Sequence, residues 1–266
     1  MDINSITLSY FSPTGTTAQV LEGISEGIRT DKIRKLDLTP PEASTWEYPK
    51  IEYDLIIVGA PVYGGRLPAE AVRRLKRIEG SGEPAVIVVV YGNRAYEDAL
   101  LERWELSKEI VFKPFAGGVF IGEHSFSSKK TPIAIGRPDT VDLEKAREFG
   151  TSIEKTLKTK QASDLEIEIQ IPGSSPYKEW RPPKNVFPST NTALCTLCNT
   201  CRRVCPNGAI SVNDTVSTDP RLCIQCSACV RYCPEGARLW KSKWVDTVAH
   251  RLSEHYSNRK EPEIYM

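Results

Sequence analysis

Short apolar runs alternate with longer stretches of helical periodicity over residues 1–160. Runs that are apolar throughout are typical of strands buried on both faces, as in a parallel sheet that helices cover from either side. The alternation therefore predicts an α/β domain with a parallel sheet. The predicted strands are Ser5–Tyr10, Ile33–Leu38, Asp54–Ala60, Ala85–Tyr91 and Phe112–Ile121.

Four helices are predicted between and after these strands. The first two have apolar faces made by Val20, Leu21, Ile24 and Ile28 and by Ala71, Val72, Leu75 and Ile78. Five strands and four helices in this order predict a doubly wound sheet, with a ligand site at the carboxyl ends of its strands. The remaining two helices are predicted at Ala95–Lys108 and Val141–Leu157.

The pattern changes after residue 160. Alternation over Leu165–Ile171 predicts a strand, and the prolines that follow predict a stiff connector. Near the end, Val245, Val248, Leu252 and Tyr256 share one face of a predicted helix, which we expect to dock onto the body of the protein or to bind a partner. The predicted segments are 1–160 (α/β domain), 161–190 (strand and connector), 191–242 (a cysteine-rich domain) and 243–266 (helix and tail).

Charge and hydropathy exclude several classes of partner. The 266 residues hold 35 Lys and Arg against 34 Asp and Glu, so no overall field favours nucleic acid or an anionic membrane. The longest apolar runs have strand length and predict no membrane span. Because the chain begins Met1-Asp2-Ile3-Asn4 without a basic or apolar leader, we expect a cytoplasmic protein.

All eight cysteines lie in two copies of C-x2-C-x2-C-x3-C-P, which start 28 residues apart at Cys195 and Cys223. Closely spaced thiolates of this kind hold iron-sulfur clusters. A structural zinc site is the alternative, but it usually joins two separate C-x2-C pairs and leaves the third cysteine without a role. A disulfide framework is typical of small secreted domains, which this chain does not resemble.

Residues from about Leu194 to Leu239 resemble the bacterial ferredoxins that carry two [4Fe-4S] clusters, including the segments that start at Pro206 and Pro234. The resemblance implies a small α+β domain, one-electron transfer and crossed ligation. One cluster would be held by Cys195, Cys198, Cys201 and Cys233, and the other by Cys223, Cys226, Cys229 and Cys205. Oxygen-labile clusters favour the reducing interior of an anaerobe.

The loop after the first predicted strand reads Ser12-Pro13-Thr14-Gly15-Thr16-Thr17 and leads directly into a helix. Hydroxyl groups and free backbone N–H groups at a helix start can bind a phosphate. The loop lacks the glycine and lysine patterns of ATP and NAD sites. An ordinary helix N-cap at a strand-to-helix turn is the alternative.

Two further loops follow the third and fourth predicted strands and contain Pro61–Gly65 and Tyr91–Tyr96. In a doubly wound sheet both lie beside the phosphate loop, and their tyrosines could enclose a flat ring. The alternative is that these tyrosines pack in the body of the domain. The three loops together predict a flavin site.

These loops are similar to those of flavodoxins, and the resemblance covers about Ile6–Lys158 and implies FMN as cofactor. Arg94 departs from the family, because acidic residues often surround the flavin edge in free flavodoxins. It could favour an anionic reduced flavin or pair with Glu97 or Asp98. The resemblance implies cofactor contacts at Ser12, Thr14, Gly15, Thr16, Thr17, Pro61, Val62, Tyr63, Gly64, Gly65, Tyr91, Gly92, Asn93, Arg94, Ala95 and Tyr96.

The whole chain resembles the flavodoxin/ferredoxin fusion proteins of anaerobes. FMN exchanges one or two electrons and each cluster exchanges one, so we expect an electron carrier that couples unlike redox proteins as donors and acceptors. The alternative is an FMN-dependent reductase of a quinone, a flavin or another small molecule, fed by the clusters. A redox sensor that signals through the terminal helix is a third hypothesis. The sequence leaves a homodimer open.

Overall fold

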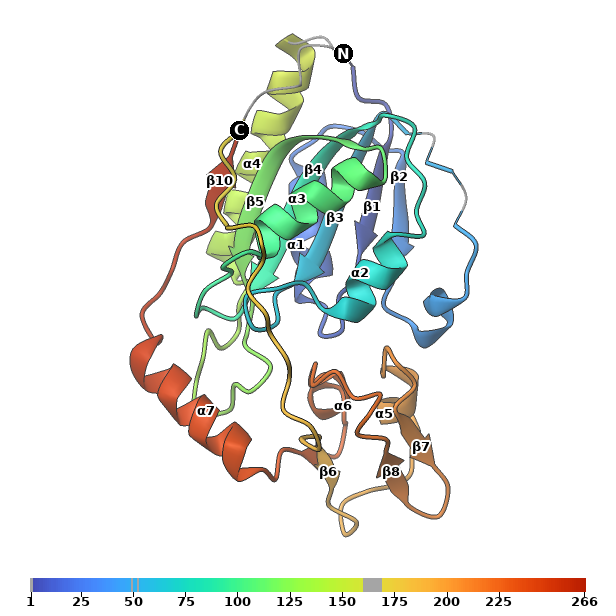
Figure 1. Cartoon of the computed structure of the whole chain (residues 1–266), viewed down its shortest axis with the longest axis vertical. Helices are drawn as coiled ribbons and strands as arrows, with labels where there is room; N and C mark the ends of the chain where they lie inside the picture. Colours follow the sequence, from blue (N-terminus) through green and yellow to red (C-terminus); the bar gives the residue numbers. More distant parts are fainter. Residues whose placement is uncertain (1, 49, 52, 160–168) are drawn as a thin grey trace.

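The computed structural model describes residues 2–48, 50–51, 53–159 and 169–266, and its body is an α/β sandwich (Figure 1). The five predicted strands form the parallel part of one sheet, in the order β2-β1-β3-β4-β5. This is the flavodoxin-like order of a doubly wound sheet. The fold-class prediction is therefore confirmed. The strands are β1 (Ile6–Tyr10), β2 (Ile33–Asp37), β3 (Leu55–Pro61), β4 (Pro84–Tyr91) and β5 (Lys113–Ile121).

Helices cover both faces of this sheet. On one face lie α1 (Thr16–Glu26) and α4 (Thr140–Thr159), and on the other lie α2 (Ala69–Leu75) and α3 (Ala99–Glu109). Successive side chains of β3 alternate between the two cores, because side chains of a strand point to opposite faces. A short 3₁₀ helix, η1 (Pro41–Ser44), follows β2.

The end of the chain adds a helix and a strand to the body. α7 (Lys243–His255) buries Val245 and Leu252 and packs against Ile133, so the predicted docking of its apolar face is confirmed. β10 (Glu263–Tyr265) then pairs antiparallel with β5. The sheet therefore has a sixth strand that the sequence pattern did not predict, since three residues are too few to show a period.

The cysteine motifs lie in a small α+β unit, residues 189–242, which we call the ferredoxin module. Its elements are two short antiparallel pairs and two single-turn helices. Figure 1 shows the module beyond the carboxyl ends of the parallel strands, beside α7. The elements are β6 (Ser189–Thr190), α5 (Thr200–Arg203), β7 (Ile210–Val212), β8 (Val216–Thr218), α6 (Ala228–Arg231) and β9 (Arg238–Leu239).

The connector runs along the surface of the body. Residues 165–168 of the predicted strand Leu165–Ile171 lie outside the described residues, and Ile169–Ile171 form no strand but pack on the core. Further on, the Arg66 guanidinium lies 4.7 Å from the ring centroid of Tyr177. Among the described helices, none has both the length and the apolarity that crossing a bilayer requires.

Candidate functional site

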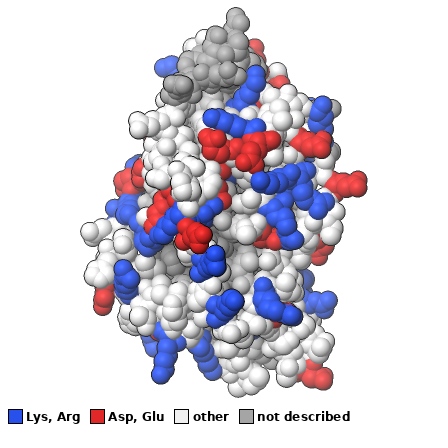
Figure 2. Space-filling model, in the orientation of Figure 1, with Lys and Arg blue, Asp and Glu red and all other residues white. Residues whose placement is uncertain are grey.

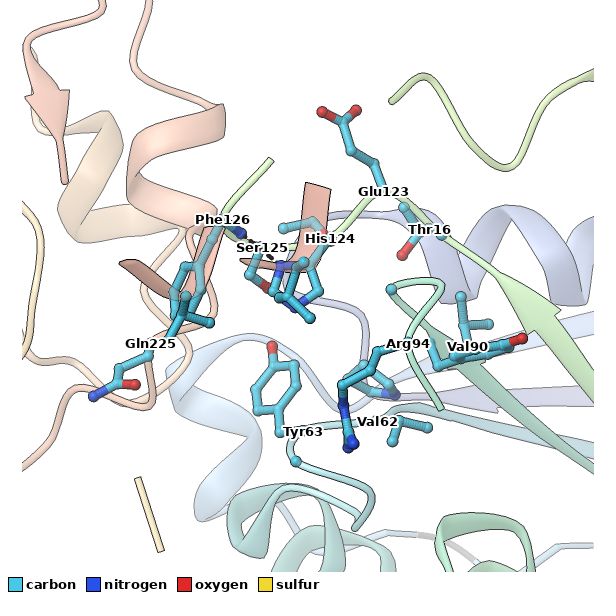
Figure 3. A pocket seen from close by; sticks show the side chains of 18 of the residues that line it. Thr16, Val62, Tyr63, Val90, Arg94, Glu123, His124, Ser125, Phe126 and Gln225 are labelled. Carbon is cyan, nitrogen blue, oxygen red and sulfur yellow. Dashed lines mark hydrogen bonds between the residues drawn. The ribbon is translucent and has the colours of Figure 1, made fainter. Parts of the chain in front are cut away.

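A cavity of about 420 Å³ lies at the carboxyl ends of the parallel strands, where ligands bind in doubly wound folds (Figure 3). We call it the main cavity. The loops after β1, β3, β4 and β5 form one side, and the connector, the ferredoxin module and α7 line the other. Its lining includes Thr14, Thr16, Pro61, Val62, Tyr63, Gly64, Val90, Tyr91, Gly92, Arg94, Gly122, Glu123, His124, Ser125, Phe126, Lys178, Trp180, Ile224, Gln225, Trp244, Val248, Arg251 and Leu252.

The loop before α1 has the geometry of an anion site. Gly15 is the N-cap with φ +82°, a left-handed conformation that glycine adopts at no steric cost. The Ser12 Oγ accepts a hydrogen bond from the Ala18 N–H at 3.1 Å, which shapes the turn. The buried Thr17 Oγ1 has no hydrogen-bond partner among the described residues. Thr14 and Thr16 reach the main cavity, so the loop fits a phosphate group.

Tyr63 and His124 project into the main cavity from the loops after β3 and β5 (Figure 3). Burial raises the pKa of Tyr63 well above its usual value, and nearby Cys226 and Cys223 raise it further. Burial lowers the pKa of His124 to about 4, and Arg94 contributes to the shift. Since the His124 Nδ1 accepts a hydrogen bond from the Phe126 N–H at 3.0 Å, the neutral ring offers its Nε2–H group as a donor.

Arg94 forms the predicted ion pair with Glu97, and its effect on a flavin stays a prediction. Its guanidinium lines the main cavity and also pairs with Glu97 at 2.6 Å. Glu97 binds the Lys178 ammonium group at 2.7 Å as well. The pKa of Glu97 is lowered: burial opposes the shift, but hydrogen bonds from Arg94 and Lys178 outweigh it. One carboxylate beside the cavity is thus shared by two cations.

Other predicted contact residues lie close by without lining the cavity. The Tyr96 hydroxyl bonds Glu263 and Tyr265 of β10, and the Asn93 amide donates to the carbonyl groups of Tyr256 and Asn258. These two side chains hold the C-terminal tail. The predicted residues that line the cavity are Thr14, Thr16, Pro61, Val62, Tyr63, Gly64, Tyr91, Gly92 and Arg94, whereas Ser12, Gly15, Thr17, Gly65, Asn93, Ala95 and Tyr96 do not.

Sequence reasoning missed several residues of the lining. His124 and Phe126 follow β5, and their place at the carboxyl end of a parallel strand was a signal that could have identified them. Trp180, Gln225 and Trp244 belong to the connector, the ferredoxin module and α7. No local pattern marks them, because only tertiary packing brings their segments to the cavity.

The eight cysteines line two smaller cavities in the ferredoxin module. Each cavity collects three cysteines of one motif and the last cysteine of the other. Within the described part of the chain, no three His, Cys, Asp or Glu side chains are gathered so as to hold a single metal ion. The outer cysteine cavity is lined by Cys195, Cys198, Cys201 and Cys233, and the inner cysteine cavity by Cys205, Cys223, Cys226 and Cys229.

Burial strongly affects the thiols of the inner cysteine cavity. It raises the pKa of Cys226 far above its usual value and that of Cys229 to about 11, although Arg238 lowers the latter. Thiolates therefore form there only with a positive group such as iron, which deprotonates the thiols that bind it. Backbone N–H groups of Ala209 and Ala237 donate to the sulfur atoms of Cys205 at 3.3 Å and Cys233 at 3.2 Å. Both cavities fit sulfur-ligated clusters.

The inner cysteine cavity adjoins the main cavity. Ile224 and Gln225 line both, since they stand between two cysteines and face the loops of the sheet. Three contacts hold this arrangement: Arg74 donates to the Pro206 carbonyl at 2.6 Å, Ser227 donates to the Ser125 carbonyl, and Arg231 pairs with Glu123 at 3.2 Å. The ferredoxin module is thus fixed over the main cavity.

Comparison with known proteins agrees with the division of the chain into a sheet domain and a ferredoxin module. Residues 194–237 match the family model of the 4Fe-4S dicluster domain. No curated protein matches the chain. Among solved structures, an archaeal flavodoxin is 14% identical, with 58% of this chain and 99% of that chain covered and a TM-score of 0.37. Flavodoxin 2 from Bacillus cereus is 18% identical, with 57% of this chain and 99% of that chain covered and a TM-score of 0.41.

A third structure is the rubredoxin:oxygen oxidoreductase of Desulfovibrio gigas, with 14% identity, 59% of this chain and 36% of that chain covered, and a TM-score of 0.43. These similarities are weak, and the fold assignment rests on the strand order of the sheet itself. The chain joins a flavodoxin-like sheet to a segment of the two-[4Fe-4S] type, and in both respects it resembles a flavodoxin/ferredoxin fusion with a role in electron transfer.

Proposed function

We propose that this chain relays electrons between FMN in the main cavity and two [4Fe-4S] clusters in the cysteine cavities. The observation that carries the proposal is that the main cavity and the inner cysteine cavity share Ile224 and Gln225. Only this short segment separates the two sites. FMN supplies exchange of one or two electrons and each cluster supplies exchange of one, which suits a protein that couples unlike redox partners in an anaerobic metabolism.

The proposed cluster ligands follow the cysteine cavities. Cys195, Cys198, Cys201 and Cys233 would hold the outer cluster, and Cys205, Cys223, Cys226 and Cys229 the inner one. The outer site reaches the surface, where Cys198, Leu194 and Leu197 are exposed. Figure 2 shows mainly basic side chains on the visible face over the lower part of the molecule. We infer that redox proteins dock near the outer site.

The main cavity would hold FMN at its phosphate group and at its ring. The loop from Ser12 to Thr17 offers backbone N–H groups and hydroxyls to the phosphate. Tyr63 and Trp180 flank the space for the ring, and His124 presents a neutral donor to it. Arg94 lines this space, and its charge would favour a reduced and negatively charged ring.

The cover of the main cavity favours a relay over a reductase. A reductase would leave one face of the flavin open to a quinone or another small molecule. Here Trp180 of the connector, Gln225 of the ferredoxin module and Trp244 of α7 line the outer side and occupy part of the approach to the flavin, although both tryptophans remain partly exposed. Because one chain brings the sheet and the module together, the relay requires no second copy.

Cofactor content tests the proposal first. Protein purified without oxygen should contain about eight irons and about eight sulfides per chain, together with one FMN. Chemical analysis and visible spectra measure all three. Zinc in place of iron, or only one cluster, would contradict the assignment of the two cysteine cavities.

Transfer between the sites tests the relay itself. After flash reduction of the clusters, the flavin should be reduced at a rate that is independent of protein concentration, since the two sites lie in one chain. Absorbance changes at several dilutions measure this rate. A rate that falls on dilution would show transfer between chains, and no transfer at any concentration would refute the relay.

A further inference from the structure

Arg238 is a buried cation in the ferredoxin module without an acidic partner among the described residues. Only 3% of its surface is exposed. Its guanidinium donates to the Thr190 Oγ1 at 2.7 Å and the Thr218 Oγ1 at 2.9 Å, and its Nε has no partner in the described part. Glu235 lines the outer cysteine cavity together with Arg238 but forms no ion pair with it, and Asp219 pairs with Arg221. A buried charge is costly unless an opposite charge compensates it.

The two copies of the internal repeat differ at the position of this arginine. Shifted by 28 residues, Cys205-Pro-Asn-Gly-Ala-Ile210 aligns with Cys233-Pro-Glu-Gly-Ala-Arg238. Both final positions are buried and both oppose a threonine, because Ile210 pairs with Thr218 and Arg238 with Thr190. The first copy has an apolar side chain in its core, and the second has a cation at the equivalent position.

The guanidinium lies between the two cysteine cavities. Arg238 lines the outer cavity, and its NH2 group lies 3.7 Å from the Cys229 Sγ of the inner one. Its contact with Thr218 reaches the strand pair of the first copy, so the side chain spans both halves.

We propose that Arg238 is a shared counter-charge that raises the reduction potential of both clusters. The proposal rests on the proposed function, in which both cysteine cavities hold clusters. Each electron added makes a cluster more negative, and a reduced cluster repels the electron that its neighbour takes up. A buried cation between them stabilises both reduced states and offsets part of this repulsion. The module can then hold two electrons, the number that FMN exchanges.

The test replaces Arg238 with the residue of the other copy, Arg238→Ile. In anaerobic redox titrations followed by electron paramagnetic resonance, we expect the equilibrium constant for reduction of each cluster to fall about tenfold or more, a shift of about 59 mV or more for a one-electron couple. The fraction of molecules with both clusters reduced should fall more steeply than the fraction with one. Arg238→Lys keeps the charge and should titrate close to the wild type. Exposed Arg221→Ile is the matched control and should leave both potentials unchanged.

Iron content separates this proposal from the proposed function. Wild-type protein with fewer than about eight irons would contradict the clusters themselves. Unchanged potentials in fully loaded Arg238→Ile would overturn the counter-charge role alone, as would an equal shift in Arg238→Lys. If Arg238→Ile does not take up iron, Arg238→Gln keeps a hydrogen-bond donor without the charge and should show the same shift.

If neither neutral variant takes up iron while Arg238→Lys loads fully, the cation is required for both clusters and the proposal stands. Poor loading of Arg238→Lys as well would assign Arg238 a purely structural role and overturn it.

Discussion

At the residue scale, we expect the proposed phosphate site to depend most on Gly15. Its φ of +82° strains any other residue, and a Cβ there would lie 3.1 Å from the Tyr232 hydroxyl. We expect Gly15→Val to lose FMN and to keep the full iron content, because the nearest atom of the ferredoxin module is the hydroxyl at the end of the Tyr232 side chain and not a cysteine. Flavin absorbance and iron analysis measure both. Gly82→Val, with φ +98° and an open environment, is the control and should retain FMN.

A second prediction at this scale concerns the titration of His124. Its native pKa of about 4 lies below the ordinary value of 6.5, so below about pH 6.5 the unfolded chain binds a proton that the native ring does not. Stability should therefore fall as the pH decreases from about 6.5 towards 4, by about 1 kcal/mol between pH 7.5 and 5.5. Thermal unfolding at several pH values measures this loss. His124→Gln should show a weaker pH dependence, and an identical one would contradict the assignment.

At the element scale, α7 acts as a wall of the main cavity. Leu252 is 7% exposed and packs in a small core with Ile133 and Ala249, while Trp244 faces the cavity. Leu252→Asp would bury a charge in that core, which is unfavourable enough to release the helix. We expect quenching of flavin fluorescence by iodide to increase several-fold. The exposed substitution Glu254→Gln should leave quenching unchanged, and equal quenching in all three proteins would show that α7 does not cover the flavin.

The same scale explains the limits of the sequence predictions. Periodicity predicted all five parallel strands and four helices within a few residues, because each buries an apolar face with its own repeat. β10 is too short to show such a repeat, and its three residues form a strand because they pair with β5. The loop after β5 was also missed, although its position at the sheet edge brings His124 into the cavity.

At the scale of the whole molecule, Arg74 links the sheet to the ferredoxin module. It is 1% exposed and pairs with Glu70 at 2.5 Å. It also donates to the carbonyl of Pro206, which follows Cys205. In Arg74→Met, Glu70 would keep its ion pair with the exposed Arg73, but the carbonyl groups that Arg74 binds would lose their donor, which should cost about 1–3 kcal/mol of stability.

We expect Arg74→Met also to slow flavin reduction after flash reduction of the clusters, since the module loses a contact that fixes it over the main cavity. The matched control is Arg77→Met, because Arg77 donates only to the Ser44 and Trp46 carbonyls of the body. Transfer at the wild-type rate in Arg74→Met would show that the other contacts suffice to position the module.

The sequence by itself determined the two halves of this protein. The doubled C-x2-C-x2-C-x3-C-P motif and the alternation of strands and helices are local patterns, and each specifies its unit without reference to the other. The loop at Ser12–Thr17 is likewise local, because a helix start carries its own anion site.

Only the tertiary structure decided how the halves meet. Trp180, Gln225 and Trp244 line the outer side of the main cavity. Ile224 and Gln225 lie between the main cavity and the inner cysteine cavity. The position of Arg238 between the cysteine cavities depends on two strand pairs that lie far apart in the sequence. Such contacts follow from the packing of distant segments, for which no spacing along the chain is a signal.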